Sequence, residues 1–176
     1  MISAPLDWYG VNYYNPIRVA PPAPEALDSF AGFGMPEGLP FGIREIEGYE
    51  KTDFGWPVVP DGLRETLVQL RERYGGDRLP PVYITENGCA VDEPAEDTRR
   101  IAFLDGHLRA LREAIDAGVD VRGYFTWSLT DNIEWTEGVS KRFGLVHIDY
   151  ETLRRTPEGS YAWYRDVIKT QRSGDN

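Results

Sequence analysis

A carboxylate at the end of a short strand pattern is the feature of this chain that most favours chemistry. The run from Tyr83 to Gly88 combines aromatic and β-branched residues, which favour a strand, with an Asn-Gly pair, which favours a turn directly after Glu86. The Pro80-Pro81 pair marks the start of that strand. Carboxylates at the C-terminal ends of barrel strands serve as nucleophiles or general acids in glycoside hydrolysis. Taken alone, the segment fits equally well with a Glu86 that only caps the turn.

Further motifs extend this pattern over most of the chain. The stretch GYFTWSLTDNIEW occupies Gly123–Trp135, GVSKRFGL follows at Gly138–Leu145, and VNYY lies near the N-terminus at Val11–Tyr14. Together with TENG at Thr85–Gly88, and in this order, these motifs closely resemble the C-terminal part of family 1 glycoside hydrolases, the β-glucosidases and β-galactosidases. The resemblance runs from about residue 7 to about residue 168.

The resemblance implies an α/β fold that forms part of a (β/α)8 TIM barrel. The motifs match the sixth, seventh and eighth strands of the family's barrel. The family's acid/base carboxylate lies in an Asn-Glu-Pro motif after the fourth strand, and these 176 residues contain no such motif. A complete barrel takes roughly 250 residues. We therefore expect residues 1–176 to be the C-terminal portion of a β-glucosidase-like enzyme, covering the sixth to eighth βα units and lacking the acid/base half.

By this resemblance, Glu86 is the nucleophile of a retaining glycosidase. Such an enzyme needs a second carboxylate about 5 to 5.5 Å away to protonate the leaving oxygen. Position alone would make Glu134 or Asp131 a candidate, because both follow a strand end. The family instead uses the position of Glu134, together with Trp135, to hold sugar hydroxyls, and we expect Asp131 to shape its loop as a hydrogen-bond acceptor. The position of Tyr14 in the family hydrogen-bonds the nucleophile and orients it.

The remaining expected site residues concern sugar recognition. Trp127 matches the family's aromatic platform beneath the sugar ring, although core packing is the ordinary role of a strand tryptophan. Relatives that act on 6-phosphorylated sugars carry Ser at the position of Glu134 and Tyr at that of Phe143, and a carboxylate would repel a phosphate. We therefore expect an unphosphorylated β-glucoside or β-galactoside. The expected substrate-binding residues are Asn12, Trp127, Glu134, Trp135 and Phe143.

The composition indicates an acidic globular protein. Hydrophobic residues make up 41% and charged residues 27% of the chain, and the net charge of −10 argues against nucleic acid as a partner. We find no apolar run of the roughly 20 residues that a membrane span needs, and no signal-peptide pattern, so we expect a cytoplasmic location. Cys89 is expected to be a small buried hydrophobe. Neither His107 nor His147 has metal-ligand spacing, so we expect no metal and no cofactor.

Strand and helix patterns alternate along the chain, which predicts parallel βα units. Residues 15–60 are rich in Pro and Gly and are expected to form a long loop, which by the family resemblance would help wall the substrate cleft. Residues 171–176 are expected to form a flexible tail. Helical spacing begins at residue 61 and again at about residue 97, and Thr156-Pro157 would start the last helix. The expected strands cover residues 8–13, 82–86 and 121–127, with an extended arm at 143–148.

An incomplete barrel leaves open strand edges, here at residues 8–13 and 121–127. It also removes the partners of the side chains expected to face across the barrel: Val82, Ile84, Val121 and Phe125. We therefore expect self-association, binding of an N-terminal half-barrel fragment, or partial disorder from about residue 15 to residue 55. Two alternatives remain open at this point: a non-catalytic sugar-binding or assembly module, and one chain of a split enzyme.

Overall fold

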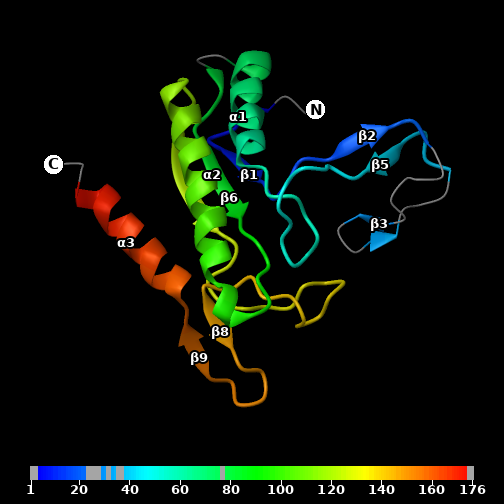
Figure 1. Ribbon diagram of the computed structural model, residues 1–176. Coiled ribbons are helices and arrows are strands. Elements are labelled where there is room, and N and C mark those ends of the chain that lie inside the picture. The colour runs from blue at the N-terminus through cyan, green and yellow to red at the C-terminus, as the bar shows by residue number, and fades with distance from the viewer. Residues whose placement is uncertain (1–3, 23–28, 31–32, 35–37, 76–77, 174–176) are drawn as a thin grey trace.

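A three-stranded parallel sheet forms the centre of the protein. Its strands are β1 (Tyr9–Asn12), β6 (Val82–Asn87) and β7 (Val121–Thr126), in the order β1-β6-β7. The strand expectations are confirmed to within one residue at either end. The computed structural model describes, with gaps between them, residues 4–22, 29–30, 33–34, 38–75 and 78–173 (Figure 1).

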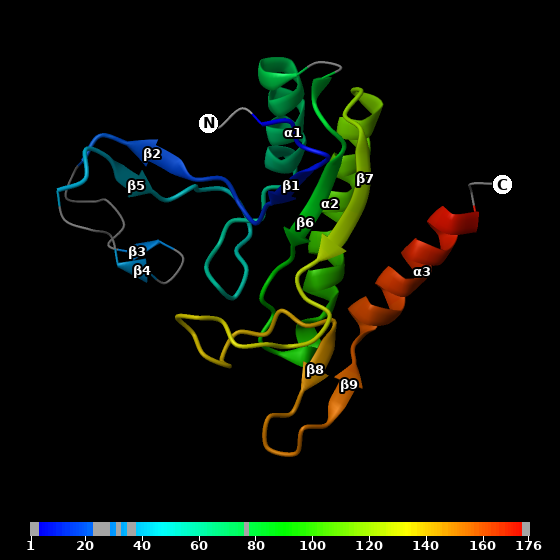
Figure 2. The same cartoon turned by 180° about the vertical axis from the view of Figure 1, so that it is seen from behind.

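Two helices cover one face of this sheet, as Figures 1 and 2 show from opposite sides. Helix α1 (Pro60–Tyr74) begins with a proline, whose missing N–H has no intrahelical partner to lose at that position. Helix α2 (Thr98–Asp116) follows the short 3₁₀ turn η2 (Pro94–Glu96) and connects β6 to β7. The apolar stripes of both helices pack on the central strand through a shared core: Leu63, Leu67, Val82, Ile84, Leu111 and Ala114.

The face of β6 that meets the helices differs from the one expected. Val82 and Ile84 are fully buried in the core beneath α1 and α2, and Val121 packs against the same core, so the prediction that they face across a barrel is wrong. The β6–β7 register pairs Val82 with Val121 and then shifts, which keeps Val121 on the helix side. Phe125 is 58% exposed. The opposite face carries a shallow pocket lined by Trp8, Tyr83, Thr85 and Phe125.

The segment expected as a long loop carries short antiparallel pairs of its own. Strand β2 (Arg18–Ala20) pairs with β5 (Gly42–Arg44), and β3 (Ser29–Phe30) pairs with β4 (Phe33–Gly34). This ribbon extends away from the central sheet in both views (Figures 1 and 2). The expected disorder falls in part on residues 23–28, 31–32 and 35–37, which lie outside the described residues.

The C-terminal part consists of a short hairpin and a helix. Strand β8 (Val146–Ile148) pairs with β9 (Arg155–Pro157), and α3 (Gly159–Ser173) follows. The prediction that Thr156-Pro157 starts the helix is wrong, because both residues pair with β8 at an edge where a proline costs no ladder bond. Residues 171–173, expected in a tail, are helical. Residues 174–176 lie outside the described residues.

A buried charge cluster attaches α3 to α2. The Arg100 guanidinium is 2% exposed, and its Nη1 lies 2.6 Å from both Asp97 Oδ1 and Glu158 Oε2. Asp97 Oδ2 accepts the backbone N–H of Ser160 at 2.5 Å. Breaking such a buried pair leaves an uncompensated charge, so this cluster holds the first turn of α3 against α2.

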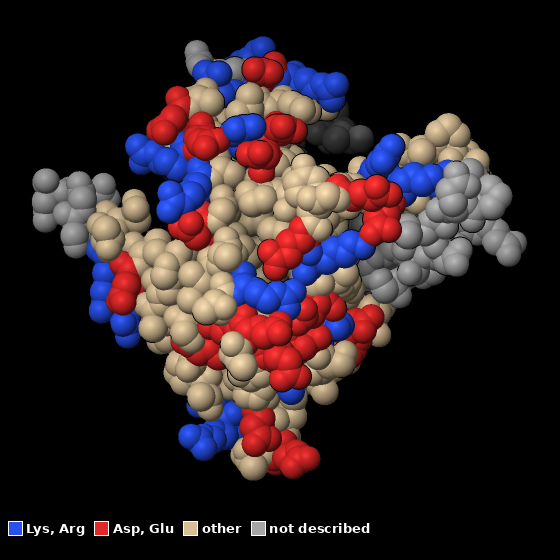
Figure 3. All heavy atoms as spheres, in the orientation of Figure 1, with Lys and Arg blue, Asp and Glu red and all other residues tan. Residues whose placement is uncertain are grey.

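The surface over α1 and α2 is mixed in charge. Figure 3 shows acidic and basic side chains intermingled, without a continuous basic patch on the described part of this face. Within the described ranges, no helix is long and apolar enough to cross a membrane.

Candidate active site

The ends of β1 and β6 bring Tyr14 and Glu86 into direct contact. The Tyr14 hydroxyl donates a hydrogen bond of 2.7 Å to Glu86 Oε2. The backbone supports this contact, since the Tyr13 N–H donates to the Glu86 carbonyl at 2.9 Å. Burial, and then the adjacent Glu86 carboxylate, raise the pKa of Tyr14 well above its usual range. The phenol therefore stays protonated and acts as a fixed donor to one carboxylate oxygen.

Asn87 and Gly88 connect the end of β6 to both neighbouring strands. The fully buried Asn87 side chain donates to the Tyr13 carbonyl at 2.7 Å and accepts from the Tyr124 hydroxyl at 2.6 Å. A β-carbon at Gly88 would lie 1.8 Å from the Trp127 carbonyl oxygen, so no larger residue fits there. This close approach places Trp127 beside the strand end that carries Glu86.

The loop after β7 adds a second carboxylate. Trp127 Nε1 donates to Glu134 Oε1 at 3.2 Å. Glu134 sits in a tight turn, in which its N–H donates to the Gly138 carbonyl at 2.8 Å and the Gly138 N–H donates back at 2.7 Å. The next side chain, Trp135, is 93% exposed at the rim. The side chains of Trp127, Glu134 and Trp135 therefore lie one after another along one edge of the site.

An aromatic group forms the opposite wall. Trp56 stacks on Phe54 with ring centroids 4.3 Å apart and meets the Tyr14 ring edge-on at 5.3 Å. Phe143, 2% exposed, contacts the rings of Tyr14, Phe54 and Trp56. Sequence reasoning assigned no role to Phe54 or Trp56. The signal available was a Phe-Gly-Trp triplet at the end of the long loop, in a segment that already resembled the family.

These elements enclose a cleft of about 500 Å³. It is lined by six of the seven expected site residues: Tyr14, Glu86, Trp127, Glu134, Trp135 and Phe143. Asn12 is the exception, because it is not among the residues that line the cleft. Its Oδ1 instead accepts a 2.6 Å hydrogen bond from the Thr85 hydroxyl on the neighbouring strand. The structure thus joins residues from three strand ends, and from loops far apart in sequence, in one concave surface.

The cleft combines features that suit a sugar. An indole face can stack on the C–H groups of a pyranose, and a carboxylate can accept hydrogen bonds from two hydroxyls. The Tyr14 hydroxyl fixes one oxygen of the Glu86 carboxylate, and a carboxylate at such a position is a group that can act as a nucleophile. Among the described residues, no group of three or more His, Cys, Asp and Glu side chains is placed to hold a metal ion. Burial raises the pKa of the Cys89 thiol to about 12, which makes it a poor nucleophile.

Comparison with known proteins gives a consistent assignment. The profile described as "Glycosyl hydrolase family 1" matches residues 1–173. The chain is 41% identical over 170 residues to the beta-glucosidase of Agrobacterium sp. (strain ATCC 21400), a match that covers 93% of this chain and 34% of that protein. It is 39% identical over 184 residues to the bifunctional beta-D-glucosidase/beta-D-fucosidase of Bifidobacterium breve, covering 96% of this chain and 38% of that protein.

Solved structures show the same similarity. The family 1 β-glucosidase of Thermotoga maritima superposes with a TM-score of 0.76 at 37% identity, covering 93% of this chain and 35% of that one. The same enzyme in complex with noeuromycin gives a TM-score of 0.77 at 38% identity, with the same coverage. The chain thus spans about a third of the length of the relatives it matches. With a family profile that extends over nearly all of its residues, the chain belongs to glycosyl hydrolase family 1.

Proposed function

We propose that this chain is the C-terminal portion of a retaining β-glucosidase that hydrolyses unphosphorylated β-D-glucosides, and that it carries the nucleophile half of the active site. Its three strands then correspond to the sixth to eighth βα units of the barrel. The observation that supports this most directly is the 2.7 Å hydrogen bond from Tyr14 to Glu86 at adjacent strand ends. The named β-glucosidases among the relatives support the substrate class.

The proposed reaction assigns the first bond-forming step to Glu86. Its carboxylate attacks the anomeric carbon and forms a glycosyl ester as the bond to the leaving oxygen breaks. The leaving oxygen takes a proton from the acid/base carboxylate, which by the family resemblance lies in the portion that this chain does not cover. Water then cleaves the ester and returns Glu86 to its starting state. Tyr14 holds the attacking carboxylate in orientation through both steps.

The position of Glu134 in the cleft supports the proposal that the substrate is an unphosphorylated sugar. Its Oε1 is held by the Trp127 indole N–H, and it lines the same cleft as Glu86. A carboxylate there accepts hydrogen bonds from sugar hydroxyls but would face a phosphate with like charge. β-Galactosides are the second candidate substrate, because the same contacts would serve either sugar.

An N-terminal half-barrel is the partner we propose for this chain. In the described sheet, β1 and β7 are the outer strands, and the face opposite the helices exposes Trp8 and Phe125, which line a pocket together with Tyr83. Edge strands and an exposed apolar face both favour association. A non-catalytic sugar-binding or assembly module, and self-association, are the competing outcomes.

Active-site labelling tests the nucleophile assignment without the acid. We would incubate the chain with 2,4-dinitrophenyl 2-deoxy-2-fluoro-β-D-glucoside, whose leaving group departs without protonation, and locate any adduct by peptide mass spectrometry. Labelling at Glu86, absent in Glu86→Gln, would support the proposal. Turnover of an ordinary aryl β-glucoside would then be measured for the chain alone, and with an added polypeptide carrying the part of the Thermotoga maritima β-glucosidase that this chain does not match. No labelling of the chain, together with no turnover either by the chain alone or with the added polypeptide, would favour the non-catalytic module.

A further inference from the structure

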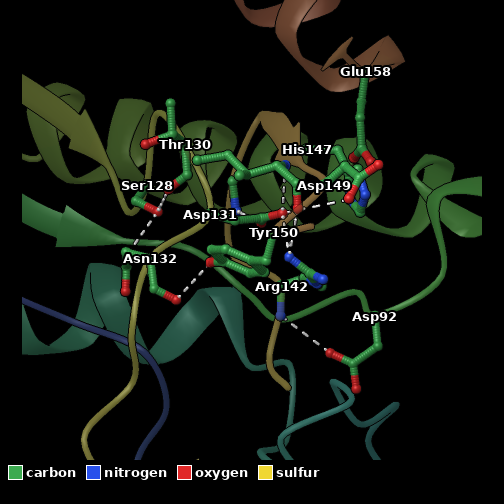
Figure 4. A network of polar contacts seen from close by, with 12 residues as sticks. Asp92, Ser128, Thr130, Asp131, Asn132, Arg142, His147, Asp149, Tyr150 and Glu158 are labelled. Atoms are coloured by element: carbon green, nitrogen blue, oxygen red, sulfur yellow. Dashed lines mark hydrogen bonds and ion pairs between the residues drawn. The ribbon is translucent and has the colours of Figure 1, made fainter. Parts of the chain in front are cut away.

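Asp131 is a buried carboxylate at the base of the loop that carries Glu134. It is 4% exposed, and both of its oxygens accept hydrogen bonds. Oδ1 accepts the Gly144 N–H at 3.0 Å, and Oδ2 accepts the Ile148 N–H at 3.0 Å. Oδ2 also accepts a hydrogen bond of 3.1 Å from Arg142 Nη1, and Figure 4 shows these two side chains. His147 Nδ1 lies 3.4 Å from Oδ2. Because donors face both oxygens, the site requires a carboxylate rather than an amide.

A ring of contacts continues from Asp131 to the start of the same loop. The Arg142 guanidinium lies 4.6 Å above the centre of the Tyr150 ring, and the Tyr150 hydroxyl donates to the Asn132 carbonyl at 3.1 Å. The Asn132 amide in turn donates to Ser128 Oγ at 3.1 Å, as Figure 4 shows. These contacts connect residues 131–132 with residues 142–150. They therefore close the loop at both ends.

The backbone approaches itself closely at the same place. A β-carbon at Gly144 would lie 2.2 Å from the Asp131 nitrogen and 2.6 Å from the Thr130 carbonyl carbon, so the position accepts only glycine. The Asp131 N–H also donates to the Val146 carbonyl at 3.2 Å. Phe143, adjacent to Gly144, forms part of the aromatic wall of the cleft. The Asp131 carboxylate thus links its own segment to residues 142–148, and both Asp131 and Gly144 lie directly beside a cleft-lining position.

We propose that Asp131 is the positioning residue of the 132–143 loop: it sets the placement of Glu134 relative to Phe143 and thereby the affinity of the cleft for sugar. Asp131 does not line the cleft, so it acts through these two side chains. Replacing it by asparagine keeps its size but turns an N–H₂ group toward N–H donors, which breaks at least one contact. The proposal rests on the proposed function, since it takes the cleft to be a sugar site.

Binding and amide exchange together test this. We would compare Asp131→Asn with two controls: Asp105→Asn, an exposed helix aspartate, and Val119→Ala, a buried core truncation remote from the loop. Affinity for deoxynojirimycin, the ligand of one of the Thermotoga maritima complexes, is measured by calorimetry, and Tm by thermal unfolding. Asp131→Asn should weaken binding about ten-fold or more, the equivalent of one lost charge-assisted hydrogen bond. Val119→Ala should lower Tm and leave affinity within about two-fold.

The outcomes separate the two proposals. If the unchanged chain binds deoxynojirimycin and Asp131→Asn binds no more weakly than Val119→Ala, the positioning role is overturned. If the unchanged chain binds no aza-sugar, the sugar site itself fails, and amide exchange still tests whether Asp131 positions the 132–143 loop. The amides of Gly144 and Ile148, and those of residues 133–139, should exchange at least ten-fold faster in Asp131→Asn than in Asp105→Asn. Should Asp131→Asn not fold, Arg142→Gln, which removes one of the three donors, decides by the same two measurements.

Discussion

The hydrogen bond from Tyr14 to Glu86 gives the sharpest prediction. Tyr14→Phe removes one hydroxyl and leaves the ring contacts with Trp56 and Phe143 in place. A hydrogen bond to a charged group contributes about 1.5 to 3 kcal/mol, which corresponds to roughly a 10- to 150-fold change in rate. We expect the rate of Glu86 labelling by the dinitrophenyl fluoroglucoside to fall by that factor. The leaving group needs no acid, so the measurement does not depend on the acid/base carboxylate.

Tyr13→Phe supplies a matched control. The Tyr13 hydroxyl also makes a 2.7 Å hydrogen bond, but to the Val59 carbonyl in the core on the other side of the strand. Both variants lose one phenolic hydrogen bond, and both should lower the free energy of unfolding. Only Tyr14→Phe should slow labelling. Equal labelling rates in the two variants at equal stability would refute the view that Tyr14 orients the nucleophile.

Four further predictions follow from the same structure. Under the proposed function, in which the acid/base carboxylate lies outside this chain, the chain alone should hydrolyse aryl β-glucosides at a barely detectable rate, because general acid catalysis supplies roughly 10²- to 10⁴-fold; a turnover near 1 s⁻¹ that Glu86→Gln abolishes would contradict this. In the assembled enzyme, Glu134→Ser should reduce turnover of neutral sugars more than Glu134→Gln does, and equal small losses would exclude a direct sugar contact. Burial lowers the pKa of His107 from 6.5 to about 4, so its contribution to stability is complete above pH 6.5 and is lost as the pH falls toward 4. Urea unfolding should show a slope of up to about 1.4 kcal/mol per pH unit in that window, and His107→Phe should flatten it. When no half-barrel partner is added, the chain should self-associate through the open side of the sheet, which light scattering at micromolar concentration would detect; a compact monomer with protected amides in both β1 and β7 would contradict this.

The elements that dominate the fold could be predicted because each has a strong local signal. Alternating β-branched residues mark β6, and apolar residues three and four positions apart mark α2. The pairing of Tyr14 with Glu86 was also expected, since it follows from a family resemblance that spans both strands. Their contact at 2.7 Å agrees with that expectation in geometry.

Other features depend on contacts that no local pattern reveals. Val82 and Ile84 could face either layer in an alternating strand, and only the docking of α1 and α2 decides which. The local sequence Thr156-Pro157 is typical of a helix start. Both residues instead pair with β8, so α3 begins only at Gly159. Phe54 and Trp56 enter the site because a loop folds back over Glu86, a long-range contact that hydrophobic periodicity does not encode.

The two faces of the sheet differ in how completely this chain covers them. The helix-facing side is a closed core in which Leu63, Leu67 and Ile84 are fully buried, whereas the opposite side leaves Trp8 and Phe125 exposed. The cleft belongs to neither face. It is built at the strand ends from contacts that this chain makes with itself, through Asn87, Asp131 and the Tyr14 hydroxyl. Under the proposed function, we expect the sugar ring to contact this cleft, and we expect the proton donor to come from the part of the barrel that would cover the open face.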